Sequence, residues 1–312
     1  MTATATAAGA PTTTPKTDNA AARRRRRRNT LVGWSFLLPN FLGFGALTLV
    51  PVLGAFVVSF TDWDSYTSPR WIGFANFRRL WRDDNFWAAL QNTCWYAAGH
   101  IPLTLLVSLG LAVALNQKLR GVRLLRTAFF FPYVTSLVAV AVVWNMLFSP
   151  DVGPIDQFLE HLGIAHPPGW TSSTDWAMPA LIITSTWRDM GYYMVLFLAG
   201  LQAVPAELYE QARVDGAGAW HRFWHITLPG LRPTTFFVLI MITISSFKVF
   251  DLVQVMTNGG PGRATLVLSQ LVYREGITKG RFGYASAVSL ALFLVVLVIT
   301  LVQFQAQRRS EK

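Results

Sequence analysis

The fold of this chain is decided by apolar runs such as YASAVSLALFLVVLVITLVQF, residues 284–304, which contain no Asp, Glu, Lys or Arg. About 20 apolar residues in a helix cross the roughly 30 Å hydrocarbon core of a bilayer. Five further runs are long enough, at residues 31–60, 94–116, 128–148, 177–202 and 234–256. Only helices and closed barrels can span lipid, because backbone polar groups must be paired internally. The runs are continuous rather than alternating, which predicts an all-α, polytopic membrane protein with six transmembrane helices.

Composition and charge placement agree with a membrane protein. The chain has 312 residues, of which 52% are hydrophobic and only 14% charged, whereas a soluble domain has about 25% charged residues. As core helices of a soluble protein, the runs would be unusually long helices with no polar face. The net charge of +11 is concentrated in a run of arginines, Arg23 to Arg28, directly before the first apolar segment. A basic segment there sets membrane orientation and contacts anionic lipid, so no nucleic-acid partner is expected.

The distribution of basic residues predicts that both termini lie in the cytoplasm. Loop 117–127 would then be cytoplasmic and has four basic residues and no acid, while loop 149–176 would be external and has acids and no Lys or Arg. Loop 257–283, with four basic residues outside, disagrees. We therefore expect a disordered basic cytoplasmic tail at residues 1–30, a transmembrane domain at 31–305 with a long cytoplasmic loop at 203–232, and a cytoplasmic tail at 306–312.

The most polar segment between two apolar runs is ELYEQARVDGAGAWHRFWHITLP, residues 207–229. Pro205 suits a helix start, the dipeptide Asp215-Gly216 indicates a turn, and Pro229 ends the second short helix. The segment therefore predicts a cytoplasmic helix–turn–helix. Its apolar residues would either lie on the membrane or dock into a groove of another protein; they are Leu208, Ala212, Trp220, Phe223 and Trp224.

The sequence contains no motif that indicates catalysis. It has no G-x-x-x-x-G-K-[ST] loop for a nucleotide phosphate. His221 and His225 have the spacing of helical metal ligands, but no H-E-x-x-H pattern accompanies them. We expect a solvated or interface-facing histidine pair, no metal site, and no catalytic residues.

Ionisable residues inside the apolar runs are more informative, because each is costly in lipid unless it is paired or faces a cavity. Four were identified: Arg188, Asp189, Lys248 and Asp251. Lys248 and Asp251 are predicted to share one helical face at i,i+3. Two interpretations stay open, a polar pathway for a hydroxyl-rich solute and an internal ion-pair cluster. The candidate pathway residues are Asn145, Trp187, Arg188, Asp189, Tyr192, Lys248 and Asp251.

The polar segment resembles the signature loop of bacterial ATP-binding-cassette (ABC) importer permeases, E-A-A-x3-G-x9-I-x-L-P. The matching residues are Glu210, Ala212, Gly216, Ile226, Leu228 and Pro229, with Gln211 as the one departure; Asp215, Ala217 and Phe223 also fit the form found in the carbohydrate-uptake (maltose/glycerol-phosphate-type) branch. Four other stretches are similar to that branch, at residues 37–64, 72–93, 125–150 and 245–268.

This resemblance implies the type I ABC importer permease fold in a multi-pass protein of the bacterial cell membrane. It also implies a second, similar permease subunit, two cytosolic ATPase subunits that bind ATP and Mg²⁺, and an external solute-binding lipoprotein. The signature loop would be the coupling helix in a cleft of the ATPase, where Glu210 makes a charged contact and Gly216 permits the turn. No cofactor would be bound by this chain itself.

The sequence thus predicts the permease subunit of a sugar importer. The alternatives are an importer of the same type for glycerol-3-phosphate or a polyol, and a self-contained secondary transporter or channel. A neutral sugar suits Trp187, Tyr192 and Asn145, whereas a phosphorylated solute suits Arg188 and Lys248. Because Asp189 and Asp251 accompany those bases, the neutral sugar is favoured.

Overall fold

The structure is a computed structural model that describes residues 19–64, 66–117, 120–150 and 152–310. The chain forms two compact units, one ending at Gly54 and the other beginning at Ala55. Among the described residues, strands are limited to β1 (Thr61–Asp62) and β2 (Arg70–Trp71), which pair antiparallel with Thr61 opposite Trp71. The prediction of an all-α membrane protein is confirmed.

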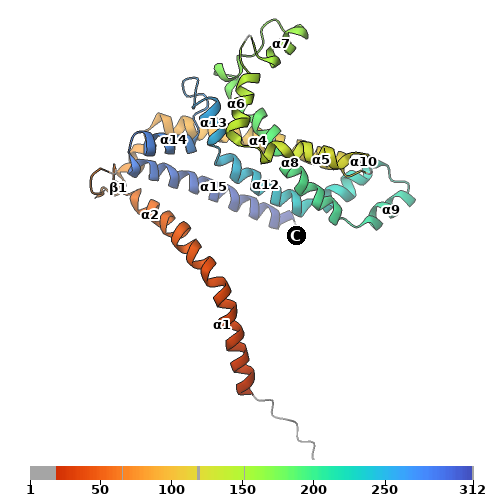
Figure 1. Cartoon of the computed structure of the whole chain (residues 1–312), viewed down its shortest axis with the longest axis horizontal. Helices are drawn as coiled ribbons and strands as arrows, with labels where there is room; N and C mark the ends of the chain where they lie inside the picture. The colour runs from red at the N-terminus through yellow and green to blue at the C-terminus, as the bar shows by residue number, and fades with distance from the viewer. Residues whose placement is uncertain (1–18, 65, 118–119, 151, 311–312) are drawn as a thin grey trace, which may run out of the picture. The chain divides into compact units, whose positions relative to one another are not determined.

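The first unit is helical throughout its described part. α1 (Asn19–Phe44) continues into a π-helical turn, η1 (Gly45–Leu49), and then into α2 (Val50–Val58), which ends in the second unit. The large apolar side chains along α1 are exposed, and Figure 1 shows α1 as one long helix. Residues 19–30 belong to α1, which corrects the predicted disordered tail over this part; residues 1–18 lie outside the described residues.

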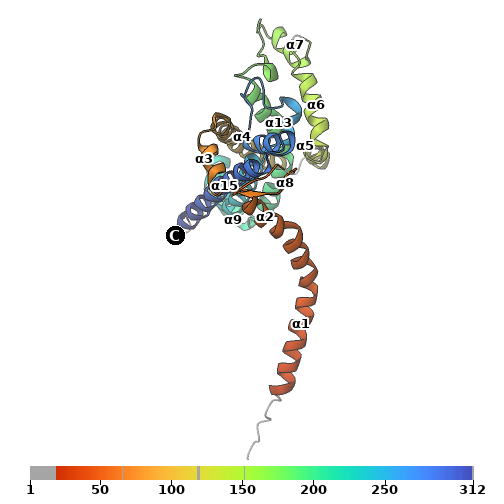
Figure 2. The ribbon, with the colours of Figure 1, turned by 90° about the vertical axis from the view of Figure 1, so that its left-hand side faces the viewer.

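The second unit is built around two long helices, α4 (Asp84–Leu115) and α8 (Ala177–Ala203), which pack along each other more extensively than any other pair. α12 (Arg232–Phe247) packs against α4, and α15 (Phe282–Ser310) against α12. The second unit also contains α3 (Ala75–Trp81), α7 (Pro154–His161), the 3-10 turn η2 (Trp170–Ser172), α13 (Asp251–Met256), α14 (Leu268–Tyr273) and the π-turn η4 (Arg274–Thr278). Figures 1 and 2 both show α7 projecting away from the α4–α8 pair.

Two of the predicted spans are broken helices, which corrects the expectation of continuous ones. Run 128–148 is divided into α5 (Val122–Val134) and α6 (Leu137–Leu147), whose axes differ by 98°. Thr135 and Ser136 are extended at this break, with ψ of 150° and 125°. Run 234–256 is interrupted between α12 and α13, where Phe250 has φ −140° and ψ −63°.

By length and composition, three helices of the described chain can each cross a membrane, and up to six spans result if each of three bent helix pairs counts as one. The three are Arg28–Val58, Asp84–Leu115 and Phe282–Arg309. The bent pairs join α5 to α6, α8 to α9 (Ala206–Val214), and the segment Ala219–Gly230 to α12. The six predicted apolar runs therefore correspond to helical structure, with sharper bends than the sequence indicates.

Close helix packing depends on glycines at two points of the α4–α5–α8 core. A Cβ built on Gly191 would overlap the backbone carbonyl of Phe129 in α5, and one built on Gly99 would lie 2.6 Å from Cδ1 of Ile182 in α8. Neither position tolerates a larger residue without movement of its neighbour. These contacts fix α8, and with it the polar residues that α8 carries.

Candidate functional site

The segment 203–232 forms the predicted helix–turn–helix. α9 (Ala206–Val214) is followed by a turn, then by α10 (Ala219–Arg222), the π-helical η3 (Phe223–Thr227) and α11 (Leu228–Gly230). Gly216 has φ +76°, the left-handed region that favours glycine. The N–H of Ala217 donates to the carbonyl of Ala212 at 2.8 Å, which closes the C-terminus of α9 as in a Schellman motif.

A side-chain contact ties the two arms of this segment together. The hydroxyl of Thr227 lies 3.0 Å from that of Tyr209 and 3.4 Å from the carbonyl of Arg222. Because its hydrogen donates to Arg222, Thr227 accepts from Tyr209. This hydrogen bond holds α9, which carries Tyr209, against η3, which carries Thr227. A rigid docking element requires such a connection.

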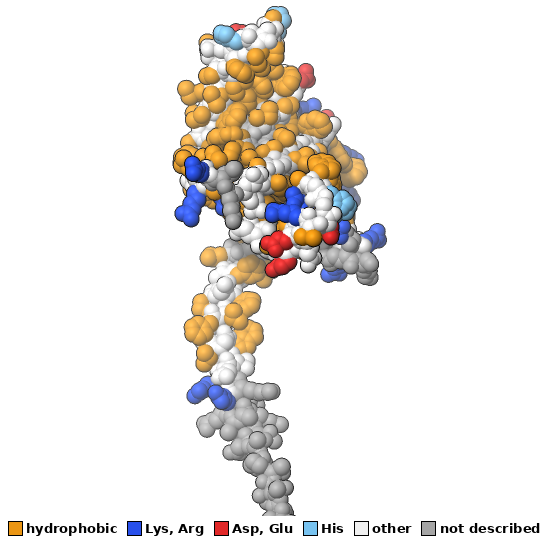
Figure 3. Space-filling view, turned by 90° about the vertical axis from the view of Figure 1, so that its right-hand side faces the viewer, with side chains coloured by type: hydrophobic (Ala, Val, Ile, Leu, Met, Phe, Trp, Pro, Cys, Tyr) orange, Lys and Arg blue, Asp and Glu red, His pale blue; other side chains and the backbone are white. Residues whose placement is uncertain are grey.

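The outer face of this segment combines exposed apolar and charged side chains. Leu208, Trp220 and Trp224 are exposed by 45%, 73% and 47%. Glu210 and Asp215 are exposed as well. Figure 3 shows charged and histidine side chains gathered on the end of the second unit that bears α9 and α10, below a mainly hydrophobic surface. The face is unpartnered within the described chain and suits a protein with a complementary groove.

The other predicted loop residues lie on the inner side of the same segment. Ala212, Ala217, Phe223, Ile226, Leu228 and Pro229 are half-buried, and Leu228 packs against the cluster around Phe197 and Leu201 of α8. His221 and His225 stack with ring centroids 3.9 Å apart. Among the described residues, no group of three or more His, Cys, Asp or Glu is placed to hold a metal ion.

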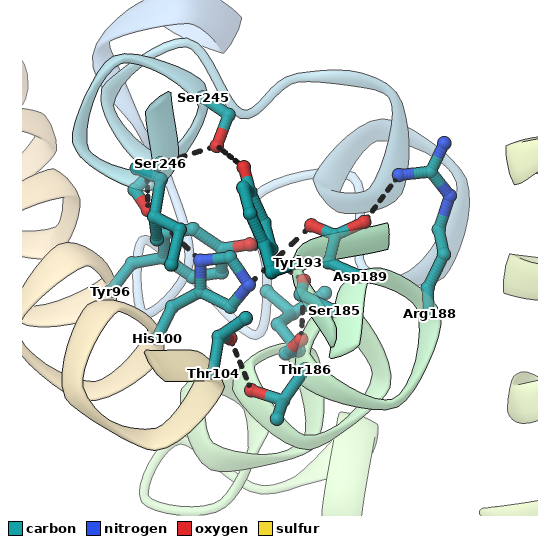
Figure 4. A network of polar contacts seen from close by, with 12 residues as sticks. Tyr96, His100, Thr104, Ser185, Thr186, Arg188, Asp189, Tyr193, Ser245 and Ser246 are labelled. Carbon is teal, nitrogen blue, oxygen red and sulfur yellow. Dashed lines mark hydrogen bonds and ion pairs between the residues drawn. The ribbon is translucent and has the colours of Figure 1, made fainter. Parts of the chain in front are cut away.

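The second candidate site is a cavity of about 150 Å³ between α4, α8 and the break that follows α12. It brings together all four charged residues predicted from the apolar runs, Arg188, Asp189, Lys248 and Asp251. Arg188 and Asp189 form an ion pair, with Nη1 of Arg188 2.7 Å from Oδ1 of Asp189 (Figure 4). The cavity thus lies where helix α12 ends in the middle of a predicted span.

The predicted relation between Lys248 and Asp251 is wrong. Lys248 follows the last residue of α12 and Asp251 is the first residue of α13, so a helix break separates them and they share no helical face. Both line the cavity, and neither takes part in an ion pair within the described ranges. Lys248 lies on the non-helical backbone between α12 and α13, which membrane proteins tolerate where it borders a cavity.

Three predicted pathway residues lie outside the lining of this cavity. The indole of Trp187 packs edge-on against Trp144, with centroids 5.5 Å apart, and Nδ2 of Asn145 lies 3.4 Å from the carbonyl of Val255. Tyr192 stacks on Tyr133 at 4.4 Å. The Tyr133 ring also lies 5.0 Å from the guanidinium carbon of Arg188. Tyr133 therefore connects Arg188 to Tyr192, while a role of these residues in solute contact stays a prediction.

Sequence reasoning missed several polar residues around the cavity, above all His100, which is 1% exposed. Figure 4 shows it between α4, α8 and α12, with Ser246 and Asp189 on either side. Tyr96 donates to Ser185 at 2.6 Å, and Tyr193 lies 3.3 Å from Ser245. A histidine inside an apolar run is an ionisable residue like the other four, so the same criterion applied to His100 would have found it.

The Arg188–Asp189 pair gives a testable stability difference. Arg188→Ala is expected to lower the free energy of unfolding by about 1–3 kcal/mol, because it leaves the Asp189 carboxylate, which is only 13% exposed, without its charged partner. The matched control is Arg70→Ala, which removes an exposed ion pair to Asp62 at 3.3 Å and should cost about 0–1 kcal/mol. Thermal unfolding in lipid nanodiscs measures both. Equal effects of the two variants would contradict a structural role for the buried pair.

Comparison with known proteins identifies the family. The family model of binding-protein-dependent transport system inner membrane components matches residues 106–312. The lactose transport system permease protein LacF of Rhizobium radiobacter is 38% identical over 288 residues, which cover 89% of this chain and 95% of that protein. The probable ABC transporter permease protein YesP of Bacillus subtilis is 36% identical over 281 residues, covering 89% of this chain and 90% of that protein.

A solved structure shares the fold. One chain of a bacterial ABC transporter involved in the import of the acidic polysaccharide alginate superimposes with a TM-score of 0.81 at 25% identity, covering 94% of this chain and 100% of that one. The chain has the fold of an ABC importer permease and belongs to the family of binding-protein-dependent transport system inner membrane components.

Proposed function

We propose that this chain is the transmembrane permease subunit of an ATP-driven importer that translocates a sugar delivered by an external solute-binding protein. The observation that carries the proposal is the helix–turn–helix at 203–232, whose exposed face includes Leu208, Trp220 and Trp224 between two long apolar helices. Such a face needs a partner, and the sequence has no nucleotide-binding loop with which to drive transport by itself.

The proposed assembly contains a second, similar permease subunit, two ATPase subunits and an external binding lipoprotein in the bacterial cytoplasmic membrane, with both termini of this chain in the cytoplasm. ATP and Mg²⁺ would bind to the ATPase subunits. A second permease is supported by the size of the cavity, since about 150 Å³ is below the roughly 300–1,000 Å³ of small-molecule sites. An external binding protein is supported by the alginate transporter, which was solved with a periplasmic protein holding an alginate pentasaccharide.

The sugar class is supported by the named relatives, which include permeases for lactose, for diacetylchitobiose and for trehalose and maltose. The cavity lining combines the rings of Tyr96 and Phe250 with polar side chains such as Ser185 and Ser245, a combination that suits a solute with apolar faces and hydroxyl edges. A second candidate is a phosphorylated polyol. The basic side chains of Arg188 and Lys248 at the cavity favour it. A relative also favours it: the sn-glycerol-3-phosphate transport system permease protein UgpA of Yersinia pestis is 35% identical to this chain over 244 residues.

Affinity purification of the tagged chain from its native membranes tests the proposed assembly. Mass spectrometry should find a second permease and an ATPase at a ratio of one copy of each permease to two of the ATPase. Recovery of the chain alone, or with copies of itself only, under conditions that preserve its fold would contradict the importer and favour a self-contained transporter.

Solute competition tests the substrate class. Uptake of a labelled disaccharide by intact cells should depend on this chain and be inhibited by related oligosaccharides. Inhibition by glycerol-3-phosphate, with none by sugars, would replace the sugar by the phosphorylated solute.

A further inference from the structure

The buried histidine of α4 sits between two polar partners on two other helices. Nδ1 of His100 lies 2.9 Å from Oγ of Ser246 in α12, and Nε2 lies 3.5 Å from Oδ2 of Asp189 in α8 (Figure 4). The ring of Tyr96 stacks on the imidazole with centroids 5.3 Å apart and a tilt of 20°. His100 is 1% exposed and lines the cavity together with Asp189.

The hydrogen bond of Ser246 fixes which imidazole nitrogen carries a hydrogen. Oγ of Ser246 lies 2.7 Å from the carbonyl oxygen of Ile242. Two oxygens approach that closely only when a hydrogen lies between them, and the carbonyl has none to give. The single hydroxyl hydrogen of Ser246 is therefore used on Ile242, so Ser246 accepts from His100, and the nitrogen that faces Ser246 is protonated.

The other nitrogen then faces a carboxylate. In a neutral imidazole with hydrogen on Nδ1, Nε2 presents a lone pair, and Oδ2 of an ionised Asp189 would present another. Two acceptors facing each other in a buried site are unfavourable. We propose that His100 and Asp189 form a buried proton-binding site, in which one proton lies between Nε2 of His100 and Oδ2 of Asp189.

The charged and titratable groups around this site determine how the proton changes the net charge of the cavity lining. Arg188 of α8 binds the other oxygen of Asp189, and Lys248 and Asp251 line the cavity beyond. The nearby tyrosines, Tyr96 in α4, Tyr133 in α5 and Tyr193 in α8, are neutral. Without the shared proton, two cations oppose two carboxylates and the lining is neutral; with it, the lining carries one net positive charge.

The site also joins three helices at one point. His100 comes from α4, Asp189 from α8 and Ser246 from α12. With the proton present, His100 connects Asp189 to Ser246; without it, the lone pairs of His100 and Asp189 repel each other. If the proposed transport function holds, opening the cavity between α8 and α12 would therefore be linked to proton release. The proton site itself does not depend on that function.

Nitrogen NMR of the full-length chain in nanodiscs, labelled with ¹⁵N-histidine, detects the proton directly. His100→Gln identifies the His100 signals among those of the five histidines. The spectra are recorded about one pH unit above the ordinary histidine pKa of about 6.5. Nδ1 of His100 should be protonated, and Nε2 should either be protonated too or accept a hydrogen bond from a protonated Asp189. An unbonded Nε2 together with an ionised Asp189, seen by the infrared carboxylate band, would overturn the proposal.

Asp189→Asn supplies a second test, because an asparagine N–H can donate to Nε2 of His100 and does not titrate. If the folded state holds a proton that the unfolded state releases, the folded state loses stability as pH rises. For one such proton, the unfolding equilibrium constant rises about tenfold per pH unit. The unfolding midpoint of the native chain should therefore fall with pH above about 7 more steeply than that of Asp189→Asn. His161→Gln, at an exposed histidine, should keep the native slope.

Parallel slopes in the native chain and in Asp189→Asn would contradict the proton site. None of these measurements depends on transport activity. A failure of the proton-site proposal can therefore be distinguished from a failure of the proposed importer function. A chain that shows the shared proton but no ATP-driven uptake would retain the proton site and lose the proposed function. The reverse result would retain the importer and lose the proton site.

Discussion

Gly216→Val is expected to lower ATP-driven uptake about tenfold or more while leaving the amount of assembled protein unchanged. Gly216 has φ +76° in the turn between α9 and α10, a conformation that costs ordinary residues about 1–2 kcal/mol and a β-branched residue more. A Cβ at Gly216 meets nothing within 4 Å, so the effect acts through the backbone and not through a clash. The turn would change its direction and displace α9 from its proposed partner.

Two variants make this prediction specific. Gly216→Asn should retain most uptake, because asparagine tolerates the left-handed region. Gly163→Val introduces the same strain at an external turn with φ +87° and equally open surroundings, and should leave coupling intact. Initial rates of uptake and of ATP hydrolysis in membrane vesicles measure all three. If Gly163→Val and Gly216→Val reduce uptake equally, the turn at Gly216 has no special part in coupling.

Gly191→Ala is expected to destabilise the second unit by about 3 kcal/mol. The added methyl group would overlap the backbone carbonyl of Phe129 in α5, and a backbone atom inside a packed helix pair moves less readily than a side chain. Overpacking of this kind typically costs about 1–3 kcal/mol. Because Arg188 and Asp189 precede Gly191 in α8, displacement of this helix would also disturb the cavity. The midpoint of thermal unfolding in nanodiscs measures the change.

The matched control lies in α4. Gly110 is helical, and a Cβ there meets nothing within 4 Å, so Gly110→Ala should be neutral or raise stability by about 0.5–1 kcal/mol. Similar midpoints for Gly191→Ala and Gly110→Ala would show that α5 and α8 do not pack as closely as described.

The apolar runs predicted the helices but not their breaks. Proline did not mark them: Pro102 lies inside the unbroken α4, whereas α5 ends at Val134, two residues after Pro132. The break after α12 contains Lys248, Val249 and Phe250 and no proline or glycine. Such breaks depend on the three-dimensional surroundings of the backbone, which here include a cavity. Local sequence preferences for helix or turn do not contain this information.

The polar helix–turn–helix was predictable because its signals are local. Pro205 marks its start and Asp215-Gly216 its turn, and Gly216 has the positive φ that a glycine turn implies. The predicted end of the second helix at Pro229 is wrong, because the helix continues through Pro229 to Gly230. The cavity was predictable only in part. Charged residues in apolar runs are rare enough to single out Arg188 and Asp189, whereas serine and tyrosine are common in such runs, so Ser246 and Tyr96 carried no signal of their own.

ATP dependence of transport tests the central claim most directly. The chain would be reconstituted in proteoliposomes with the permease and ATPase that co-purify with it, and with the external binding protein and its labelled sugar. The account predicts uptake only when ATP, Mg²⁺, the ATPase and the binding protein are all present, and loss of uptake with Gly216→Val. Uptake of the same sugar by this chain in the absence of any ATPase would contradict it.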